Sequence, residues 1–249
     1  MNRFNQIFSI KYRTHLEKKV QKNQSKVVSE DTFPQVKWLS YHIPKTAGTS
    51  LRFSLEKGLG MNRIQYAYQG SFAKELSQGK PVWCNNKTDV LHGHFTHHEN
   101  HSFIYPNAQK MVWLRDPSVR AWSLFNHWLR VKSGLPYKWM QEEYFSDSKL
   151  TSDTHLLFEQ VIMNKRFKNQ FSACQTYLNG LDKQDLAFIG QCESFGKEII
   201  RLESILSVKL PLLSLNTSTS KNKICDRNKG LFTQYFQDEY DFYHELIKV

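Results

Sequence analysis

Six consecutive residues near position 45 combine a positive charge, hydroxyl groups and a glycine, a composition suited to binding phosphate. The segment is Lys45-Thr46-Ala47-Gly48-Thr49-Ser50. Backbone N–H groups in the first turn of a helix point outward with partial positive charge, and Gly48 would let that backbone approach a ligand closely. Thr49 and Ser50 add hydroxyl donors, and Lys45 adds a full charge. We therefore expect a phosphate-binding loop here.

The order of lysine and glycine separates this segment from the common nucleotide-binding loop. In a Walker A loop the lysine directly follows the last glycine. Here Lys45 precedes Gly48 by three residues. This order removes the main support for ATP-dependent phosphoryl transfer, although a P-loop nucleotide kinase or phosphotransferase stays open as an alternative. An ordinary strand-to-helix corner with an incidental lysine is the alternative that needs no ligand.

A second candidate anion site follows a buried strand-like segment further along the chain. Arg115 comes directly after that segment, and Ser123 lies eight residues later in a pattern typical of a helix. Eight residues are about two helical turns, so both side chains can face one anion outside the end of the sheet. The alternatives are a surface salt bridge between Arg115 and Asp116, and a hydrogen bond from Ser123 to its own helical turn.

Five of the ten histidines lie in one short segment: His92, His94, His97, His98 and His101. An imidazole that titrates near neutral pH can take a proton from an attacking hydroxyl group, so this segment is expected to supply a general base. The sequence HGHFTH also approaches the metal-binding pattern HxHxDH of metallohydrolases, but Thr96 stands where the aspartate would be. We expect no metal site, and we expect the last three histidines to lie in a solvated loop.

The elements that would carry these residues alternate between strands and helices. Hydrophobic and β-branched runs predict strands at 36–43, 89–92, 110–114 and 186–190. Apolar positions recurring every three or four residues predict helices from about 51 to 59 and at 118–131, 156–163, 195–206 and 238–247, with a polar loop at 214–230. This alternation predicts a three-layer α/β/α fold with a central, mainly parallel sheet, in which ligands bind at the carboxyl ends of the strands.

The composition favours a globular protein with anionic partners. The chain has 249 residues, 40% of them hydrophobic, and a formal net charge of +11. We expect a polar basic extension at 1–35 and a single domain at 36–249. Residues 1–30 hold seven basic and two acidic residues, which favours a solvated extension, with a peripheral membrane or polyanion contact as the alternative. No segment is apolar enough to span a membrane and no secretory signal is visible, so we expect a cytoplasmic protein with reduced cysteines.

Three segments together resemble one enzyme family. They are Pro44 to Ser50, His92-Gly93-His94-Phe95, and Arg115-Asp116-Pro117 followed by Arg120 and Ser123. In this order they are similar to motifs of the sulfotransferases that use 3′-phosphoadenosine 5′-phosphosulfate, in particular the carbohydrate branch that includes heparan sulfate 2-O-sulfotransferase. The similarity continues through Phe188 to Phe195 and Asp238 to Tyr243. Two departures are the bulky Trp113 and Trp122 beside the second site, and a leader without the membrane anchor of the Golgi enzymes.

The resemblance implies a P-loop-NTPase-like fold and a role for each matching residue. Lys45, Thr46, Ala47, Gly48, Thr49 and Ser50 would hold the 5′-phosphosulfate of the donor, with Lys45 also stabilising the leaving phosphate. Arg115 and Ser123 would bind the 3′-phosphate. His94 would be the general base with His92 beside it, and no metal would be required. A Golgi location would follow only if a membrane anchor had been removed.

The acceptor is expected to be a carbohydrate or another hydroxyl compound rather than a nucleic acid. Arg130, Lys132, Lys165 and Arg166 are candidates for a cleft that takes an acidic glycan, and solvated surface charges are the alternative. Asn169-Gln170 stands where related enzymes carry a similar pair. Besides the kinase, a histidine-rich metallohydrolase and a polyanion-binding module stay open as functions. The sequence makes no prediction about the oligomeric state.

Overall fold

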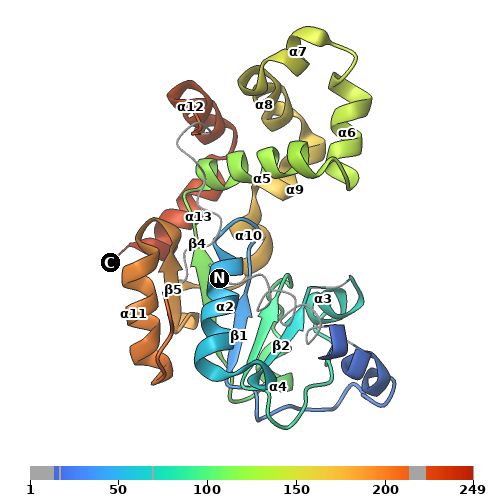
Figure 1. Cartoon of the computed structure of the whole chain (residues 1–249), viewed down its shortest axis with the longest axis vertical. Helices are drawn as coiled ribbons and strands as arrows, with labels where there is room; N and C mark the ends of the chain where they lie inside the picture. The colour runs from blue at the N-terminus through green and yellow to red at the C-terminus, as the bar shows by residue number, and fades with distance from the viewer. Residues whose placement is uncertain (1–13, 17, 69, 213–222, 249) are drawn as a thin grey trace. The chain divides into compact units, whose positions relative to one another are not determined.

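The computed structural model of the chain describes residues 14–16, 18–68, 70–212 and 223–248 (Figure 1). The chain divides into two compact units. The first, here called the sheet unit, comprises Met1–Ile43, Ala47–Trp113 and Tyr177–Leu215, and the second, the helical unit, comprises Pro44–Thr46, Leu114–Thr176 and Asn216–Val249. One domain over 36–249 stays a prediction.

The sheet unit is built on five strands in the order β2-β3-β1-β4-β5. They are β1 (Trp38–Tyr41), β2 (Ile64–Ala67), β3 (Val90–Gly93), β4 (Gln109–Leu114) and β5 (Phe188–Gln191). β1 pairs in parallel with β3 on one side and β4 on the other, and β2 pairs in parallel with β3. The chain order reverses between β1 and β4, and the carboxyl ends of strands at such a point are where open α/β sheets bind ligands.

Helices cover both faces of this sheet. Helices α2 (Gly48–Leu59) and α11 (Phe195–Leu206) pack on one face, where Leu55 and Leu202 join a buried cluster with Trp38 and Met111 (Figure 1). We call this the α2 face. Because side chains alternate along a strand, Tyr41 points to the opposite face, where its ring stacks on His101 of α4 (His101–Ile104). Helix α3 (Gly70–Ser77) also belongs to this unit.

The helical unit has a separate aromatic core. Its helices are α5 (Pro117–Val131), α6 (Leu135–Tyr144), α7 (Ser148–Ser152), α8 (Thr154–Met163), α9 (Lys168–Phe171), α12 (Asp226–Tyr235) and α13 (Gln237–Ile247), while α10 (Ala173–Leu178) begins here. Phe125, Phe158, Phe171 and Phe232 are all fully buried in one cluster. Helix α5 starts where Pro117 fixes the first helical φ and the Asp116 carboxylate accepts a hydrogen bond from the Val119 backbone N–H at 3.0 Å.

The predicted α/β class with a central, mainly parallel sheet is confirmed. The predicted helices at 118–131, 156–163, 195–206 and 238–247 correspond to α5, α8, α11 and α13 within two residues at each end. The loop predicted at 214–230 is wrong at its end, because α12 begins at Asp226, whose carboxylate lies in the first turn of the helix. Residues 214–222 of that loop, like the leader residues 1–13, lie outside the described part of the chain.

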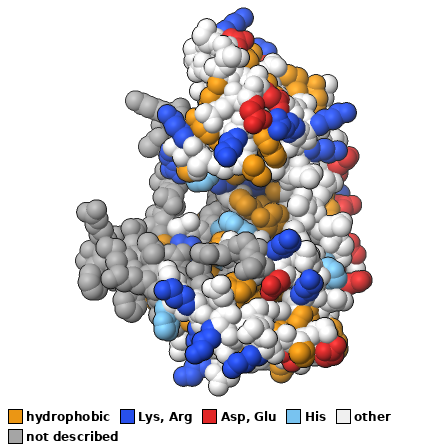
Figure 2. Space-filling model, turned by 90° about the vertical axis from the view of Figure 1, so that its right-hand side faces the viewer, with side chains coloured by type: hydrophobic (Ala, Val, Ile, Leu, Met, Phe, Trp, Pro, Cys, Tyr) orange, Lys and Arg blue, Asp and Glu red, His pale blue; other side chains and the backbone are white. Residues whose placement is uncertain are grey.

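The basic side chains do not gather in one place on the face drawn in Figure 2. Lysine and arginine side chains are spread along that face with acidic side chains among them. Within the described residues, no helix is both long enough and apolar enough to cross a bilayer. Cys84, Cys174, Cys192 and Cys225 form no disulfide bond with one another in the structure.

Candidate functional site

The predicted phosphate loop is a strained turn between β1 and α2. Lys45 has φ 75° and Ala47 has φ 58°, so two residues with a Cβ adopt the left-handed region. Such positions cost about 1–2 kcal/mol each, and in native proteins they concentrate at functional sites. Helix α2 begins at Gly48, three residues earlier than predicted, so Gly48 to Ser50 belong to the helix and not to the loop. Its N-cap residue, Ala47, supplies no side-chain hydrogen bond. The N-cap residue itself therefore satisfies none of the N–H groups of the first turn.

Gly48 makes room for a side chain that the sequence analysis did not single out. Its φ is not positive, so the backbone itself does not require glycine. A Cβ placed on Gly48 would overlap the imidazole of His42, with Nε2 as the nearest ring atom. The glycine therefore lets the His42 ring lie directly against the start of α2, which is a different role from the close ligand approach expected from the sequence.

Replacing Gly48 with alanine is therefore expected to destabilise the protein by about 1–3 kcal/mol, the usual cost of overpacking. The matched control is Gly230→Ala in α12, because a Cβ there meets nothing within 4 Å. That change is expected to be neutral or to stabilise by up to about 1 kcal/mol, since alanine is the better helix former. Urea unfolding of both variants measures the difference, and equal stability of the two would contradict the packing argument.

Three neighbouring strands place a cluster of polar rings on the α2 face, beside the start of α2. The register pairs His92 with Ser40 on one side and with Tyr66 on the other. Side chains two residues apart on a strand share a face. His42, His94 and Tyr68, two residues after Ser40, His92 and Tyr66, therefore lie on the same face, just beyond the ends of their strands. Backbone hydrogen bonds from His42 N to Gly93 O and from His94 N to Ala67 O, both 2.9 Å, extend the ladder that far.

We call His42, Tyr68, His92 and His94 the histidine cluster. The ring centroids of His42 and His92 lie 5.2 Å apart with a 9° interplanar angle, and those of His42 and His94 lie 4.5 Å apart. Tyr68 hydrogen-bonds His42 Nδ1 at 2.8 Å, and Ser40 Oγ hydrogen-bonds His92 Nδ1 at 2.8 Å. The Nε2 atoms of His92 and His94 are buried and have no hydrogen-bond partner in the described part of the chain.

Both histidines of the HGH segment are held in the neutral form. Burial, followed by the charge of Arg52 and then by His94, lowers the pKa of His92 to about 3. Burial, followed by Arg52, lowers the pKa of His94 to about 4. Each ring therefore has an unprotonated nitrogen throughout the neutral range. The ordinary histidine pKa assumed from sequence does not apply at this site, because burial disfavours the charged imidazolium.

The solvated loop expected for His97, His98 and His101 is wrong for His101. Its side chain is fully buried, and its two ring nitrogens hydrogen-bond the Tyr41 hydroxyl at 3.2 Å and the Leu76 carbonyl at 2.9 Å. His97 also contacts Tyr41, at 3.2 Å through Nδ1. The buried Tyr41 hydroxyl requires hydrogen-bond partners. His97 and His101 provide them, so both histidines pack against Tyr41.

In the helical unit, Lys45 lies among other basic groups. Arg115 Nη1 donates a hydrogen bond to the Lys45 carbonyl at 3.3 Å. Burial, and then the charges of Arg130 and Arg115, lower the pKa of the Lys45 ammonium. The pKa of His127 is also lowered, by burial and then by Lys45 and Arg130, and its Nδ1 lies 3.1 Å from Arg130 Nη2. We call Lys45, Arg115 and Arg130, beside which His127 lies, the cationic group; the repulsion among its charges is relieved when an anion binds.

Ser123 lies on α5, four residues before His127 and seven before Arg130. These spacings place the three side chains on one side of the helix. The sequence analysis did not single out His127. Its spacing of four residues from Ser123 in the predicted helix was the pattern that indicated a position on the same side of the helix. The alternative salt bridge of Arg115 to Asp116 is disfavoured, because Asp116 accepts hydrogen bonds from Ser118 and Tyr240 besides capping α5.

The acceptor candidates fall into different surroundings. Arg166 forms ion pairs with Glu142 and Glu143 and stacks on the Trp139 ring at 5.0 Å, so it has a structural role at the surface. Gln170 offers its carbonyl to the fully buried Arg120 at 2.9 Å. Among the residues that the structure describes, no group of three or more histidine, cysteine or acidic residues is arranged to hold a metal ion.

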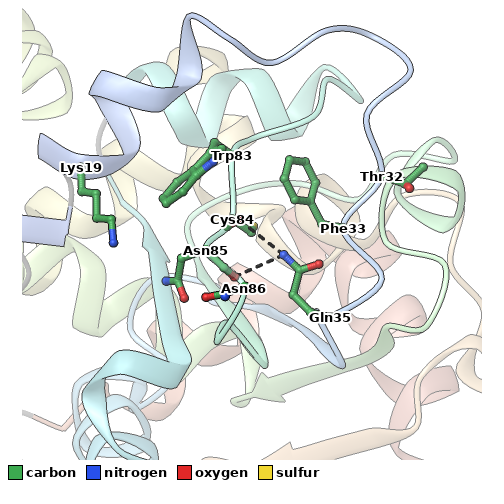
Figure 3. Close-up of a pocket in the computed structure, with 8 residues that line it drawn as sticks. All are labelled: Lys19, Thr32, Phe33, Gln35, Trp83, Cys84, Asn85 and Asn86. Carbon is green, nitrogen blue, oxygen red and sulfur yellow. Dashed lines mark hydrogen bonds between the residues drawn. The ribbon is translucent and has the colours of Figure 1, made fainter.

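A cavity of about 460 Å³ is lined by none of these residues (Figure 3). Its lining comes from segments that precede β1 and β3, so it sits at the amino ends of those strands. Gln35 lines it and donates hydrogen bonds to the carbonyls of Cys84 and Asn85 at 3.4 and 3.2 Å. Because open α/β sheets bind ligands at the carboxyl ends, the candidate site in the sheet unit is the histidine cluster beside the start of α2 rather than this cavity.

No known protein family and no curated protein matches the sequence. Among solved structures, a sulfotransferase from Alicyclobacillus acidocaldarius is 12% identical, with a TM-score of 0.44 over 85% of this chain and 95% of that chain. Mouse sulfotransferase SULT7A1 complexed with PAP is 13% identical, with a TM-score of 0.36 over 85% of this chain and 69% of that chain. At this level of similarity neither structure assigns a family or a substrate to the protein.

Proposed function

We propose that the protein is a sulfotransferase that moves a sulfuryl group from 3′-phosphoadenosine 5′-phosphosulfate to a hydroxyl group, with a carbohydrate as the acceptor class. The observation that supports it most is the neutral HGH pair. His94 has a buried Nε2 without a hydrogen-bond partner in the described chain, on the same face of the sheet as the start of α2. A neutral imidazole is what a general base for a hydroxyl acceptor requires.

The chemistry follows from the charges that change during transfer. The acceptor oxygen attacks sulfur in line, the bond from sulfur to the bridging oxygen of the 5′-phosphate breaks, and the hydroxyl proton passes to His94. Negative charge then builds on that bridging oxygen, and the Lys45 ammonium stabilises it. In this proposal Thr46 to Ser50 hold the 5′-phosphosulfate together with Lys45, Arg115 and Ser123 hold the 3′-phosphate, and His92 supports His94.

Titration calorimetry with 3′,5′-adenosine bisphosphate tests the donor assignment. Binding that persists in chelator and is not displaced by ATP is expected. Displacement by MgATP would favour a nucleotide kinase, loss of binding in chelator would favour a metal enzyme, and binding of heparin alone would favour a polyanion module. A transfer screen with labelled donor over glycans, lipids and phenols then tests the carbohydrate acceptor.

Arg115→Ala is expected to weaken 3′,5′-adenosine bisphosphate by about 10-fold or more, the usual value of a hydrogen bond to a charged group. Adenosine 5′-phosphosulfate lacks the 3′-phosphate, so its affinity is expected to change far less. Arg166→Ala is the matched control, because Arg166 belongs to the same unit and pairs with Glu143 at the surface. Equal weakening of both ligands by Arg115→Ala would refute the 3′-phosphate assignment.

A further inference from the structure

His42 occupies a place in the cluster that the proposed mechanism does not use. It is the first residue after β1, half-buried, and its ring touches those of His92 and His94. Its Nδ1 lies 2.8 Å from the Tyr68 hydroxyl. The opposite edge of the ring, at Nε2, fills the space where a Cβ of Gly48 would lie. One edge of the imidazole is therefore held by a phenol, and the other edge meets the first residue of α2.

This arrangement gives the two ring nitrogens different roles. A tyrosine hydroxyl that donates to Nδ1 leaves the proton of a neutral imidazole on Nε2, so Nε2–H becomes a donor beside the first turn of α2. The helix start adds backbone N–H groups, which the N-cap residue Ala47 does not cap. The donors beside the start of α2 are thus suited to an anion.

A second observation also indicates a ligand at this place. His92 is fully buried, yet its Nε2 has no hydrogen-bond partner among the described residues, and its ring stacks on His42. A buried polar atom without a partner costs about 1–3 kcal/mol, so native proteins rarely keep one without a functional reason. The unpartnered nitrogens of His92 and His94 therefore indicate that polar groups of a ligand bind in the space around His42.

We propose that His42 is a donor-binding residue whose Nε2–H contacts the anionic 5′ end of the sulfuryl donor, and that Tyr68 is the positioning residue that fixes its tautomer. The inference rests on the proposed function, because it takes the donor to bind at the start of α2. It adds two residues outside the set from Lys45 to Ser50. It also gives Gly48 a role, which is to seat the His42 ring beside the bound anion.

Two ligands separate contact with the 5′ end from general damage to the site. His42→Phe keeps a flat ring but removes both nitrogens, so it is expected to weaken 3′,5′-adenosine bisphosphate by about 10- to 100-fold. Adenosine 3′-monophosphate lacks the 5′-phosphate and is expected to bind with less than a twofold change. His42→Gln, which can place an amide N–H near the position of Nε2, is expected to recover most of the affinity. His98→Phe, a histidine of the sheet unit outside the cluster, is the matched control.

The tautomer is tested directly by long-range ¹H–¹⁵N NMR of the imidazoles. Wild-type His42 is expected to show a protonated Nε2 and an accepting Nδ1, and Tyr68→Phe is expected to shift it toward a mixture of tautomers while weakening the bisphosphate. A purely structural role for Tyr68 would not move the ring-nitrogen shifts of His42.

The outcomes separate the two proposals. If wild-type protein binds no 3′,5′-adenosine bisphosphate, the proposed function fails, and the role of His42 fails with it. If wild type binds it and His42→Phe binds it equally well, the inference fails while the function stands. Equal weakening of both ligands by His42→Phe would also overturn the inference, because the loss would then not be specific to the 5′ end.

Discussion

Lys45→Ala is expected to lower the rate of sulfuryl transfer by about 100-fold or more, with little change in the free energy of unfolding. The ammonium group is lost where negative charge builds on the leaving phosphate, and no other residue of the loop carries a charge. Folding is expected to be spared, because burial, and then the charges of Arg130 and Arg115, lower the pKa of Lys45, so the fold does not stabilise its charge. Removing one member of such a cationic group relieves repulsion rather than breaking an ion pair.

Lys132→Ala is the control for this variant. Lys132 also carries a positive φ, 54°, so both changes place alanine in a left-handed conformation, but Lys132 is exposed at the end of α5. With saturating acceptor its replacement is expected to leave the transfer rate unchanged, because a contact from Lys132 to an acidic acceptor would change the KM for that acceptor instead. Single-turnover measurements with saturating donor compare the two variants. Retention of more than about a tenth of the wild-type rate in Lys45→Ala would contradict the assigned role.

The pH dependence of donor binding gives an independent test of Lys45. Its pKa in the free protein is lowered, and a bound anion favours the charged form, so donor binding raises this pKa. By linkage, affinity is full below the free-protein pKa and falls as the pH rises through it. The alkaline fall is expected to begin below the ordinary lysine range and to be absent in Lys45→Ala. The same alkaline fall in both proteins would assign it to another group.

The backbone that carries the site was predictable because its signals are local. The run that forms β1, the break at Pro44 and the apolar spacing from Leu51 predict strand, loop and helix without knowledge of the rest of the chain. The same holds for β4 and α5, where Pro117 marks the first helical turn. These two strands pair in parallel in the sheet, so both loops follow carboxyl ends at the same edge of the sheet, and ligand binding there stays a prediction.

The composition of the histidine cluster was not predictable, because it depends on pairing between distant strands. β2 has only four residues, and one of them is the polar Gln65. The Gln65 side chain is buried and donates a hydrogen bond to the Trp83 carbonyl. Without β2 in its place beside β3, nothing brings Tyr68 to His42. The spacing of two in Ser40-Tyr41-His42, which matches the spacing in HGH, was the available signal. It becomes informative only once the register aligns the two strands.

Burial explains the other differences at the site. The sequence places His101 after a polar segment, which favours exposure, but the buried Tyr41 hydroxyl hydrogen-bonds it across the fold. Burial also lowers the pKa values of His92 and His94. Arg52, one turn into α2, adds to this lowering for both rings. Sequence identifies these residues as chemically capable. Only the packing determines in which protonation state they work.

His94→Ala is expected to lower turnover by about 100-fold or more at every pH, while the affinity for 3′,5′-adenosine bisphosphate stays nearly unchanged. The reason is that His94 acts on the acceptor proton and not on the donor phosphates. His98→Ala, in the same segment but outside the cluster, is the control. Stopped assays and calorimetry on the same samples separate rate from binding. An active His94→Ala would exclude His94 as the base.

The role of His94 also predicts how kcat/KM of the wild-type protein depends on pH. Because the pKa of His94 is about 4 rather than 6.5, the base stays neutral as the pH falls, and kcat/KM is expected to be flat from pH 8 to about 5. Its acid limb is expected near pH 4. An acid limb at pH 6 to 7 in folded protein would show that His94 does not carry the lowered pKa that burial gives it here.

Acid unfolding must be distinguished from that limb, and the direction of its pH dependence is fixed. His92, His94, His97 and His101 all have lowered pKa values in the folded protein, so between their folded and unfolded pKa values the unfolded chain binds more protons. Stability is therefore complete above about pH 6.5 and is lost as the pH falls toward 4. Titration of one base gives a limb with a slope of one, whereas unfolding coupled to several histidines is steeper. Circular dichroism at each pH assigns the loss of activity to one or the other.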